Sequence, residues 1–309
     1  MLLTIAIPTF NRAALLETNL FYLLSQYQNN FNIIVQDNAS TDNTENIIDK
    51  YIHLGLPIEY ERNSKNFGWT KNFELCFQKC QTKYIMVIGD DDYIVNGGIK
   101  LILDNLEHSN PDLLFLNGFA TKKKVNSHLS SKKESTINKE EFLLKTILQF
   151  RLISSHVINY EYVKRVKSFD GNFAHLHPVL IGLRDGKKFI YLKEKIVACY
   201  PNNSKFDLES NFSDTYVNEF FTLFRSYLKN VISKKYHTEI EEKMLKQYYP
   251  KLILKSRLGM IKNDKNIKYN FDTIFKKNNF YQKNSHLYYN NTLISNIFLT
   301  FKAIQSMNR

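Results

Sequence analysis

The chain has 309 residues, of which 43% are hydrophobic, enough for one large globular domain or two smaller ones. Its net charge of +12 is uneven: residues 1–100 hold 8 Lys and Arg against 11 Asp and Glu, whereas residues 229–283 hold 14 against 5. No apolar run reaches the roughly 18 residues that span a bilayer, the N-terminus has no signal-peptide pattern, and three cysteines make no even disulfide framework, so we expect reduced thiols in a cytoplasmic protein.

Short apolar runs alternate with amphipathic segments through the first part of the chain. Strands are predicted at 4–7, 32–35, 58–61, 84–88 and 112–116. Helices are predicted at 13–26, from N-capping residues 40–42 to about 51, at 69–80 and at 98–107. This alternation predicts an α/β fold, with a Rossmann-like, mostly parallel sheet flanked by helices.

The later part of the chain gives weaker signals. We expect a Lys-rich loop at 117–137, a helix at 138–150, a strand or short helix at 155–162, a helix ending near 183, β structure at 188–200 and helices from about 213. A soft boundary near Ser204 divides a predicted catalytic domain, 1–204, from a basic helical region, 205–309. Within the first domain we expect two halves, residues 1–120 and 121–204.

A polar segment follows each of four predicted strands, at residues 8–12, 36–42, 62–68 and 89–92. Ligands of parallel sheets bind at the carboxyl ends of the strands, so four such segments on one edge describe a site for a polar, charged ligand. The last segment holds three consecutive aspartates, and carboxylates at the end of a buried strand need a compensating cation. Mg²⁺ or Mn²⁺ favours carboxylate oxygens and phosphates. Neither a dinucleotide fingerprint nor a P-loop motif is present.

Taken in order, these segments resemble glycosyltransferase family 2, which has the GT-A fold. The resemblance is strong over about residues 1–120 and weak to about 200. It implies that residues 1–120 form the nucleotide-sugar half of the catalytic domain and residues 121–204 the acceptor half. It implies transfer of a sugar from a nucleotide donor (UDP-linked), with inversion and a divalent metal, to a glycan or lipid-linked acceptor in bacterial surface polysaccharide or lipooligosaccharide synthesis.

The resemblance also implies roles for individual residues. Asp37 would bind the base, Asp90 would approach the ribose, and Asp92, with Asp90, would hold Mn²⁺ or Mg²⁺ against the pyrophosphate. The implied donor-binding residues are Pro8, Thr9, Phe10, Asn11, Arg12, Asp37, Asn66, Gly68, Asp90 and Asp91. The chemistry needs the same groups, because a nucleoside diphosphate leaves with growing negative charge and the acceptor hydroxyl needs a base on the opposite face of the sugar.

The catalytic base is where the chain departs from the family. The usual Glu-Asp pair at the start of a helix is replaced by Ala174 and His175. A histidine accepts a proton near pH 7, so His175 is the first candidate, with His177 and Asp170 behind it; either histidine could instead be only a polar residue at a helix start. The alternative function is a non-catalytic nucleotide-sugar binder or assembly subunit on the same fold. A nucleotidyltransferase would need a Gly-rich basic loop after the first strand, which is absent.

The basic C-terminal region has two interpretations. It could be an ordinary Lys-rich helical surface, or its apolar residues in 282–309 could lie on an anionic membrane that presents a lipid-linked acceptor. No recognition motif supports nucleic-acid binding. The second interpretation predicts a cytoplasmic protein that is peripheral on the inner face of the cytoplasmic membrane.

Overall fold

The computed structural model describes residues 1–121, 125, 129, 134–200 and 211–307, and it divides the chain into two compact units. Unit 1 comprises Met1–Phe142 and Gln149–Pro201, and unit 2 comprises Leu143–Leu148 and Asn202–Arg309. Ser204, the predicted boundary, and most of the predicted Lys-rich loop beyond Thr121 lie outside the described residues.

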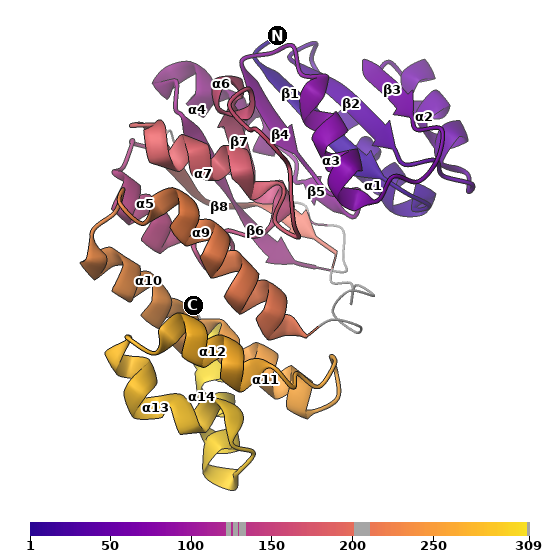
Figure 1. The fold of residues 1–309 in the computed structure, drawn as a ribbon. Coiled ribbons are helices and arrows are strands. Elements are labelled where there is room, and N and C mark those ends of the chain that lie inside the picture. Colours follow the sequence, from indigo (N-terminus) through magenta and orange to yellow (C-terminus); the bar gives the residue numbers. More distant parts are fainter. Residues whose placement is uncertain (122–124, 126–128, 130–133, 201–210, 308–309) are drawn as a thin grey trace. The chain divides into compact units, whose positions relative to one another are not determined.

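The described part of unit 1 contains one eight-stranded sheet, with strands in the order β3-β2-β1-β4-β7-β6-β8-β5. Helices flank this sheet (Figure 1). Its strands are β1 Leu3–Thr9, β2 Phe31–Asp37, β3 Ile58–Arg62, β4 Tyr84–Val87, β5 Asp92–Ile94, β6 Leu113–Ala120, β7 His156–Asn159 and β8 Phe189–Cys199. The helices of unit 1 are α1 Ala13–Leu24, α2 Thr44–His53, α3 Trp69–Gln78, α4 Gly98–Ser109, α6 Tyr160–Val163 and α7 Leu176–Asp185. Helix α5, Lys139–Thr146, begins in unit 1 and ends in unit 2.

The predicted α/β fold with a mostly parallel sheet is confirmed. β1 pairs in parallel with β2 and β4, β2 with β3, and β6 with β8. The antiparallel strands are β7, between β4 and β6, and β5, beside β8. Both faces of the central strands are buried, which explains their apolar sequences: Ile5 and Met86 on one face and Ala6 and Ile85 on the other are each 0% exposed.

The prediction that Asp92 lies in a loop after the fourth strand is wrong. Asp92 begins the short strand β5, where it lies opposite Cys199 of β8. Three residues carry too little periodicity to indicate a strand, and the partner strand lies far away in the sequence. Cys76 and Cys80 are buried and free, as expected for reduced thiols.

Unit 2 is helical, as predicted from residue 213 onward. Its helices are α9 Phe220–Leu228, α10 Lys234–Gln247, α11 Tyr249–Arg257, α12 Ile267–Phe275, α13 Asn279–Tyr289 and α14 Leu293–Met307, preceded by a π-helical turn at Asp214–Glu219. An aromatic cluster fills its core: the Phe271 ring lies 5.2 Å from Tyr249, 5.5 Å from Phe275 and 5.7 Å from Tyr288. Throughout the described residues, every helix is too short or too polar to cross a membrane.

Candidate active site

The acidic segment Asp90–Asp92, which follows β4, is held by residues at the end of β1 and just after it. Arg12 places its Nη1 atom 3.0 Å from both Asp90 Oδ1 and Asp91 Oδ2. Thr9 Oγ1 donates a 2.8 Å hydrogen bond to Asp90 Oδ2. β1 and β4 are neighbours in the sheet, so their carboxyl ends meet at one edge. Arg12 thus supplies part of the positive charge that this cluster needs.

Asp92 is fixed from the opposite side by a serine that sequence analysis did not single out. Ser154 Oγ donates a 2.5 Å hydrogen bond to Asp92 Oδ2 and accepts a 2.9 Å hydrogen bond from the Gly89 amide. Ser154 lies in a 3₁₀ turn, Ile153–Ser155, just before β7, and is fully buried. The acidic segment is therefore anchored by β1 on one side and by the β7 approach on the other.

Burial sets the protonation of this cluster. Burial raises the pKa of Asp90 to about 6, although Arg12 and the Thr9 hydrogen bond act against the shift. It raises the pKa of Asp92 to about 7, with the Ser154 hydrogen bond acting against it. A carboxyl group whose charged form is penalised by burial gains most from a cation that arrives beside it.

Carboxylate oxygens of the acidic segment lie close to Gly89, which has no side chain to fill the space beside them. A Cβ atom on Gly89 would lie 3.0 Å from Asp91 Oδ1 and 3.6 Å from Asp92 Oδ2, so oxygens of both aspartates lie close to the Gly89 Cα. Among the described residues no cluster of three or more His, Cys, Asp or Glu could hold a metal alone. Carboxylate oxygens from one or two residues fit a Mg²⁺ or Mn²⁺ whose remaining ligands are substrate phosphates and water. The oxygens of Asp90 accept hydrogen bonds from Arg12 and Thr9, and Asp92 accepts hydrogen bonds from Ser154 and the Cys199 thiol, so the metal-ligand roles of Asp92 and Asp90 stay predictions.

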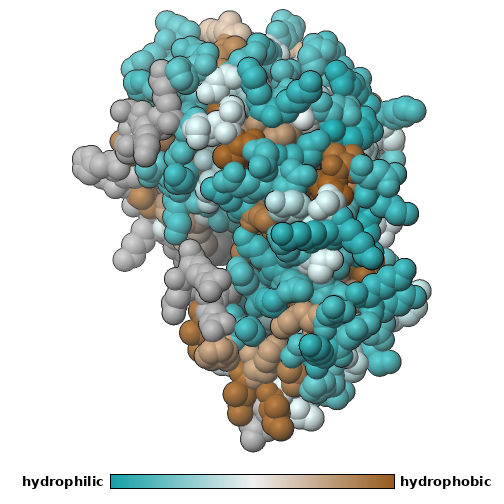
Figure 2. Space-filling view, turned by 90° about the vertical axis from the view of Figure 1, so that its left-hand side faces the viewer, coloured by the Kyte–Doolittle hydropathy of each residue, from teal (hydrophilic) through white to brown (hydrophobic). Residues whose placement is uncertain are grey.

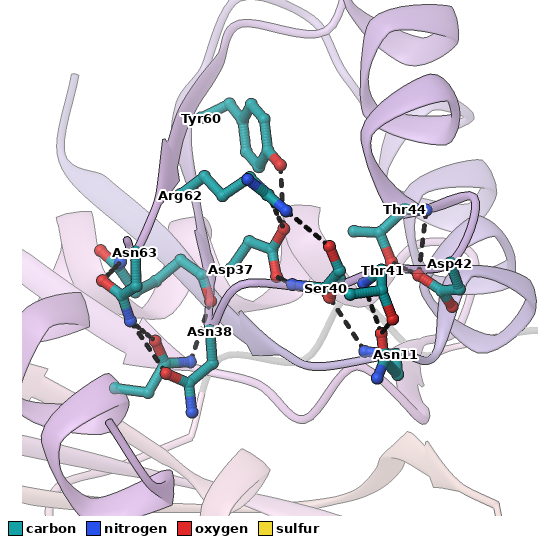
Figure 3. A network of polar contacts seen from close by, with 12 residues as sticks. Asn11, Asp37, Asn38, Ser40, Thr41, Asp42, Thr44, Tyr60, Arg62 and Asn63 are labelled. Atoms are coloured by element: carbon teal, nitrogen blue, oxygen red, sulfur yellow. Dashed lines mark hydrogen bonds and ion pairs between the residues drawn. The ribbon is translucent and has the colours of Figure 1, made fainter. Parts of the chain in front are cut away.

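Asp37, the predicted base-binding residue, ends β2 and is fully buried. Its Oδ1 accepts hydrogen bonds from the Ser40 amide at 2.9 Å and the Ser40 hydroxyl at 2.6 Å. Its Oδ2 accepts one from Tyr60 Oη at 2.9 Å, and Arg62 Nε lies 3.7 Å away (Figure 3). These partners come from β3 and from the loop after β2, so the carboxylate is held in one orientation at the edge of the sheet.

The loop after β1 is bonded to the loop after β2. The Asn11 amide donates to Ser40 Oγ at 2.9 Å, and Asn11 Oδ1 accepts from the Thr41 amide at 2.7 Å (Figure 3). Asn11 has a φ of +53°, a conformation that asparagine tolerates better than most residues. Pro8 lies within β1 opposite Gln36, and Phe10 is 40% exposed.

Buried amide groups connect these two loops to the loop after β3. Asn63 donates to Asn38 Oδ1 at 3.0 Å and to Asn72 Oδ1 at 2.9 Å, and accepts from Gln36 Nε2 at 3.0 Å. Asn38 Nδ2 also donates to Asn66 Oδ1 at 2.7 Å.

Asn66 and Gly68, both predicted donor-binding residues, lie at the far end of this loop. Asn66 Oδ1 accepts a 2.8 Å hydrogen bond from the Gly68 amide. Gly68 has a φ of +84°, which favours glycine, and it precedes the first residue of α3. The four polar segments predicted to share one edge of the sheet are therefore joined by side-chain contacts.

The three candidates for the catalytic base lie at the start of α7 and just before it. His175 is the N-cap residue of α7, and its ring lies 5.9 Å from Phe73 and 6.2 Å from Phe173. Its Nε2 lies 3.1 Å from the Arg151 carbonyl oxygen, which fixes the hydrogen on Nε2 and leaves a lone pair on Nδ1. Nδ1 is buried and has no hydrogen-bond partner among the described residues.

Burial lowers the pKa of His175 to about 3, so this ring is neutral at pH 7 and does not titrate there. His177 Nε2 lies 3.2 Å from the Asp170 carbonyl oxygen, and the Asp170 carboxylate accepts a hydrogen bond from Ser168. Asp170 also lines a pocket of about 430 Å³, together with Phe77 and Tyr160. His175 is thus the candidate with an acceptor nitrogen left over.

Comparison with known proteins identifies the family. The profile described as Glycosyl transferase family 2 matches residues 4–166, more than half of the chain and all four joined loops. The chain belongs to glycosyl transferase family 2. The family predicted from the order of the polar segments is therefore confirmed.

Named relatives agree with this assignment. The chain is 28% identical over 190 residues to the abequosyltransferase RfbV of Salmonella typhimurium, a match that covers 59% of this chain and 53% of that protein. It is 26% identical over 148 residues to the GalNAc(5)-diNAcBac-PP-undecaprenol beta-1,3-glucosyltransferase of Campylobacter jejuni, covering 46% of this chain and 47% of that protein. These matches span about half the length of each relative.

The fold also matches a solved structure over nearly its whole length. S. aureus TarS 1-349 in complex with UDP-GlcNAc superposes with a TM-score of 0.68, covering 99% of this chain and 89% of that chain, at 14% sequence identity. At this identity the likeness shows the fold alone, and it confirms the predicted GT-A architecture with a helical C-terminal region.

Proposed function

We propose that this chain is an inverting glycosyltransferase that moves a sugar from a UDP-linked donor to a glycan or lipid-linked acceptor in bacterial surface polysaccharide or lipooligosaccharide synthesis. One observation carries the proposal: the Asp90–Asp92 segment, Arg12 and the buried Asp37 lie on one connected edge of the sheet. A nucleoside diphosphate needs both a hydrogen-bonding group for its base and groups that balance the negative charge of its pyrophosphate.

In this proposal the donor binds along the joined loops. Asp37 accepts a hydrogen bond from an N–H of the base, and its rigid partners keep it oriented for that contact. Asp90 faces the ribose, while Arg12 is half exposed and can exchange a carboxylate for a phosphate oxygen. Prior positioning of these groups supplies part of the rate enhancement.

Asp92 would hold a divalent cation, with Asp91 as the second source of carboxylate oxygen. When bound, such a cation stabilises the negative charge that develops on the departing diphosphate. Asp92 would be deprotonated in that state, and the hydrogen bond from Ser154 would continue to hold its Oδ2. Asp90 is the alternative ligand if Arg12 moves to the phosphates.

The acceptor hydroxyl needs a base opposite the departing diphosphate. His175 Nδ1 is proposed for this role, with His177 and Asp170 as the remaining candidates. A nitrogen with a pKa of about 3 is a weak base. The same observation favours the second candidate function, a nucleotide-sugar binder that does not catalyse transfer.

Release of nucleoside diphosphate from a panel of nucleotide sugars, with Mn²⁺ or with a chelator, separates the two functions. The transferase releases diphosphate from at least one donor in the presence of metal, and Asp92→Ala abolishes the release while circular dichroism shows the fold intact. Binding of a donor without any release would support the non-catalytic function, and full activity of Asp92→Ala would refute the metal assignment.

A further inference from the structure

Helix α14 carries a row of exposed apolar side chains. Ile294, Ile297, Phe301 and Ile304 are 72%, 61%, 56% and 48% exposed. Their spacing of three, four and three residues places them on one face of the helix. We refer to these four residues as the α14 stripe. Single exposed apolar residues are common on proteins, but four along one helix face form a continuous patch.

The α14 stripe is not the face by which this helix packs into its own unit. Ser295, Leu299 and Ala303 are 0%, 0% and 6% exposed, and α14 packs against α10, α11 and α13. Unit 2 is therefore complete without burying the stripe. Burial of apolar surface is the dominant source of association energy, so the stripe is available for a partner.

A basic residue lies beside the α14 stripe, since Lys302 Nζ is 6.0 Å from the centre of the Phe301 ring. Arg257 lies on the buried side of α14, where its guanidinium donates to Ser295 and Asn296 and to the Tyr288 and Asn290 carbonyls. Residues 251–268, which include Arg257, hold six Lys and Arg against one Asp. Leu258 and Met260, close to Arg257 in the chain, are 65% and 51% exposed. Figure 2 shows hydrophobic residues gathered beside hydrophilic ones at the bottom of the view, where α13 and α14 lie in Figure 1.

We propose that the α14 stripe docks onto an anionic lipid membrane, with the neighbouring basic residues contacting the headgroups. Apolar residues on one helix face with lysines and arginines nearby are typical of helices that lie in a membrane interface. A second copy of the chain fits less well, because residues 229–283 carry 14 basic against 5 acidic residues and two copies would bring like charges together. A nucleic acid would match the charge but would leave the apolar stripe exposed.

This inference rests on the proposed function, because docking on a membrane would bring the enzyme to a lipid-linked acceptor. The docking itself is measured without donor or acceptor, so it can fail while the proposed function stands.

The test is sedimentation of the full chain with vesicles of phosphatidylcholine alone or mixed with phosphatidylglycerol. The wild type should pellet with the anionic vesicles and should be released by salt, because screening shortens the reach of the lysines. Ile297→Asn with Phe301→Asn should weaken vesicle binding at least about tenfold, since each large apolar side chain contributes roughly that factor or more when buried. The matched control, Ile52→Asn with Leu54→Asn, removes two exposed apolar residues of unit 1 and should bind as the wild type does.

A fluorescent reporter on the stripe tests the contact directly. The chain has one tryptophan, Trp69, so Phe301→Trp in a Trp69→Phe background gives a single reporter. Brominated lipids in anionic vesicles should quench it. The inference is overturned if the wild type stays in the supernatant, if the α14 double variant binds normally, if the reporter is not quenched, or if light scattering shows a dimer that the double variant disrupts. Unchanged diphosphate release by the double variant, with vesicle binding lost, would leave the proposed function intact.

Discussion

Folding raises the pKa of Asp92 toward neutral pH. Burial raises its pKa to about 7, from an ordinary value of 3.8. The folded chain therefore holds a proton that the unfolded chain releases, and in metal-free protein this group stabilises the fold least at high pH. The contribution of Asp92 to the free energy of unfolding falls as the pH rises from about 4 to about 7, the two pKa values of this group.

Replacing this carboxyl group with an amide should remove the pH-dependent loss. We expect Asp92→Asn to exceed the metal-free wild type in free energy of unfolding by on the order of 3 kcal/mol at pH 8, and by much less at pH 4.5. Asparagine keeps an acceptor for the Ser154 hydroxyl. Guanidinium unfolding in the presence of a chelator measures the difference at each pH, and a difference independent of pH would contradict the burial argument. Adding Mn²⁺ should stabilise the wild type and leave the variant unchanged.

Variants of His175 can distinguish a catalytic role of this residue from a structural one. Its ring is buried between Phe73 and Phe173, so truncation to alanine would also open a cavity. His175→Gln is the sharper variant because it keeps polar atoms and most of the volume. If His175 is the base, turnover should fall by roughly 10² or more with the donor Michaelis constant retained. A fall in melting temperature with near wild-type turnover would assign it to structure and move attention to His177 and Asp170.

At the scale of elements, the buried amide side chains of Gln36, Asn38, Asn63 and Asn72 form a cluster that links β2, the residue after β3, and α3. Asn63 satisfies three buried partners, Asn38, Asn72 and Gln36. Asn63→Ala leaves them without that partner, so we expect a loss of about 2 kcal/mol in unfolding free energy and a raised donor Michaelis constant. The exposed Asn46→Ala, which removes one hydrogen bond to Asn43, is the control and should change neither value appreciably. An equal effect of the two variants would mean that the cluster does not support the site.

The sequence predicted the elements that have strong local patterns. β1, β2 and β4 are built on apolar runs that end in polar segments, β3 alternates apolar and charged residues, and the positions of all four match the structure to within a few residues. The region predicted as strand or short helix at 155–162 contains both, β7 and α6. β5 and the antiparallel placement of β7 could not be predicted, because pairing with distant strands decides both.

The candidate site was predictable where a motif follows a strand. Asp37 and Asp90–Asp92 follow apolar runs that predict strands, so the sequence places them at the carboxyl ends of those strands. Ser154 and Tyr60 carry no such signal: one lies in a short 3₁₀ turn and the other within β3, and only the fold brings them to the carboxylates. The family pattern could not locate the base, because a histidine stands where the family has a carboxylate.

At the scale of the whole molecule, charge and structure divide along the chain in a similar way. Unit 1 contains the joined polar loops with Asp90–Asp92, and unit 2 contains the basic helices and the α14 stripe. The proposed donor binding therefore belongs to unit 1, and the proposed membrane docking belongs to unit 2. Variants of one unit should therefore leave the other property unchanged, since sites without shared partners act independently.

The central claim is that the edge of the sheet formed by Asp37, Arg12 and Asp90–Asp92 binds a nucleoside diphosphate together with a divalent metal. Calorimetric titration of UDP with and without Mn²⁺ tests it most directly. The account predicts that Mn²⁺ tightens UDP binding to the wild type, that Asp92→Asn abolishes this dependence, and that Asp37→Ala weakens binding about tenfold or more, the loss of one buried hydrogen bond to the base. Wild-type protein that binds UDP equally well in both conditions, or an Asp37→Ala variant with unchanged affinity, would contradict the account.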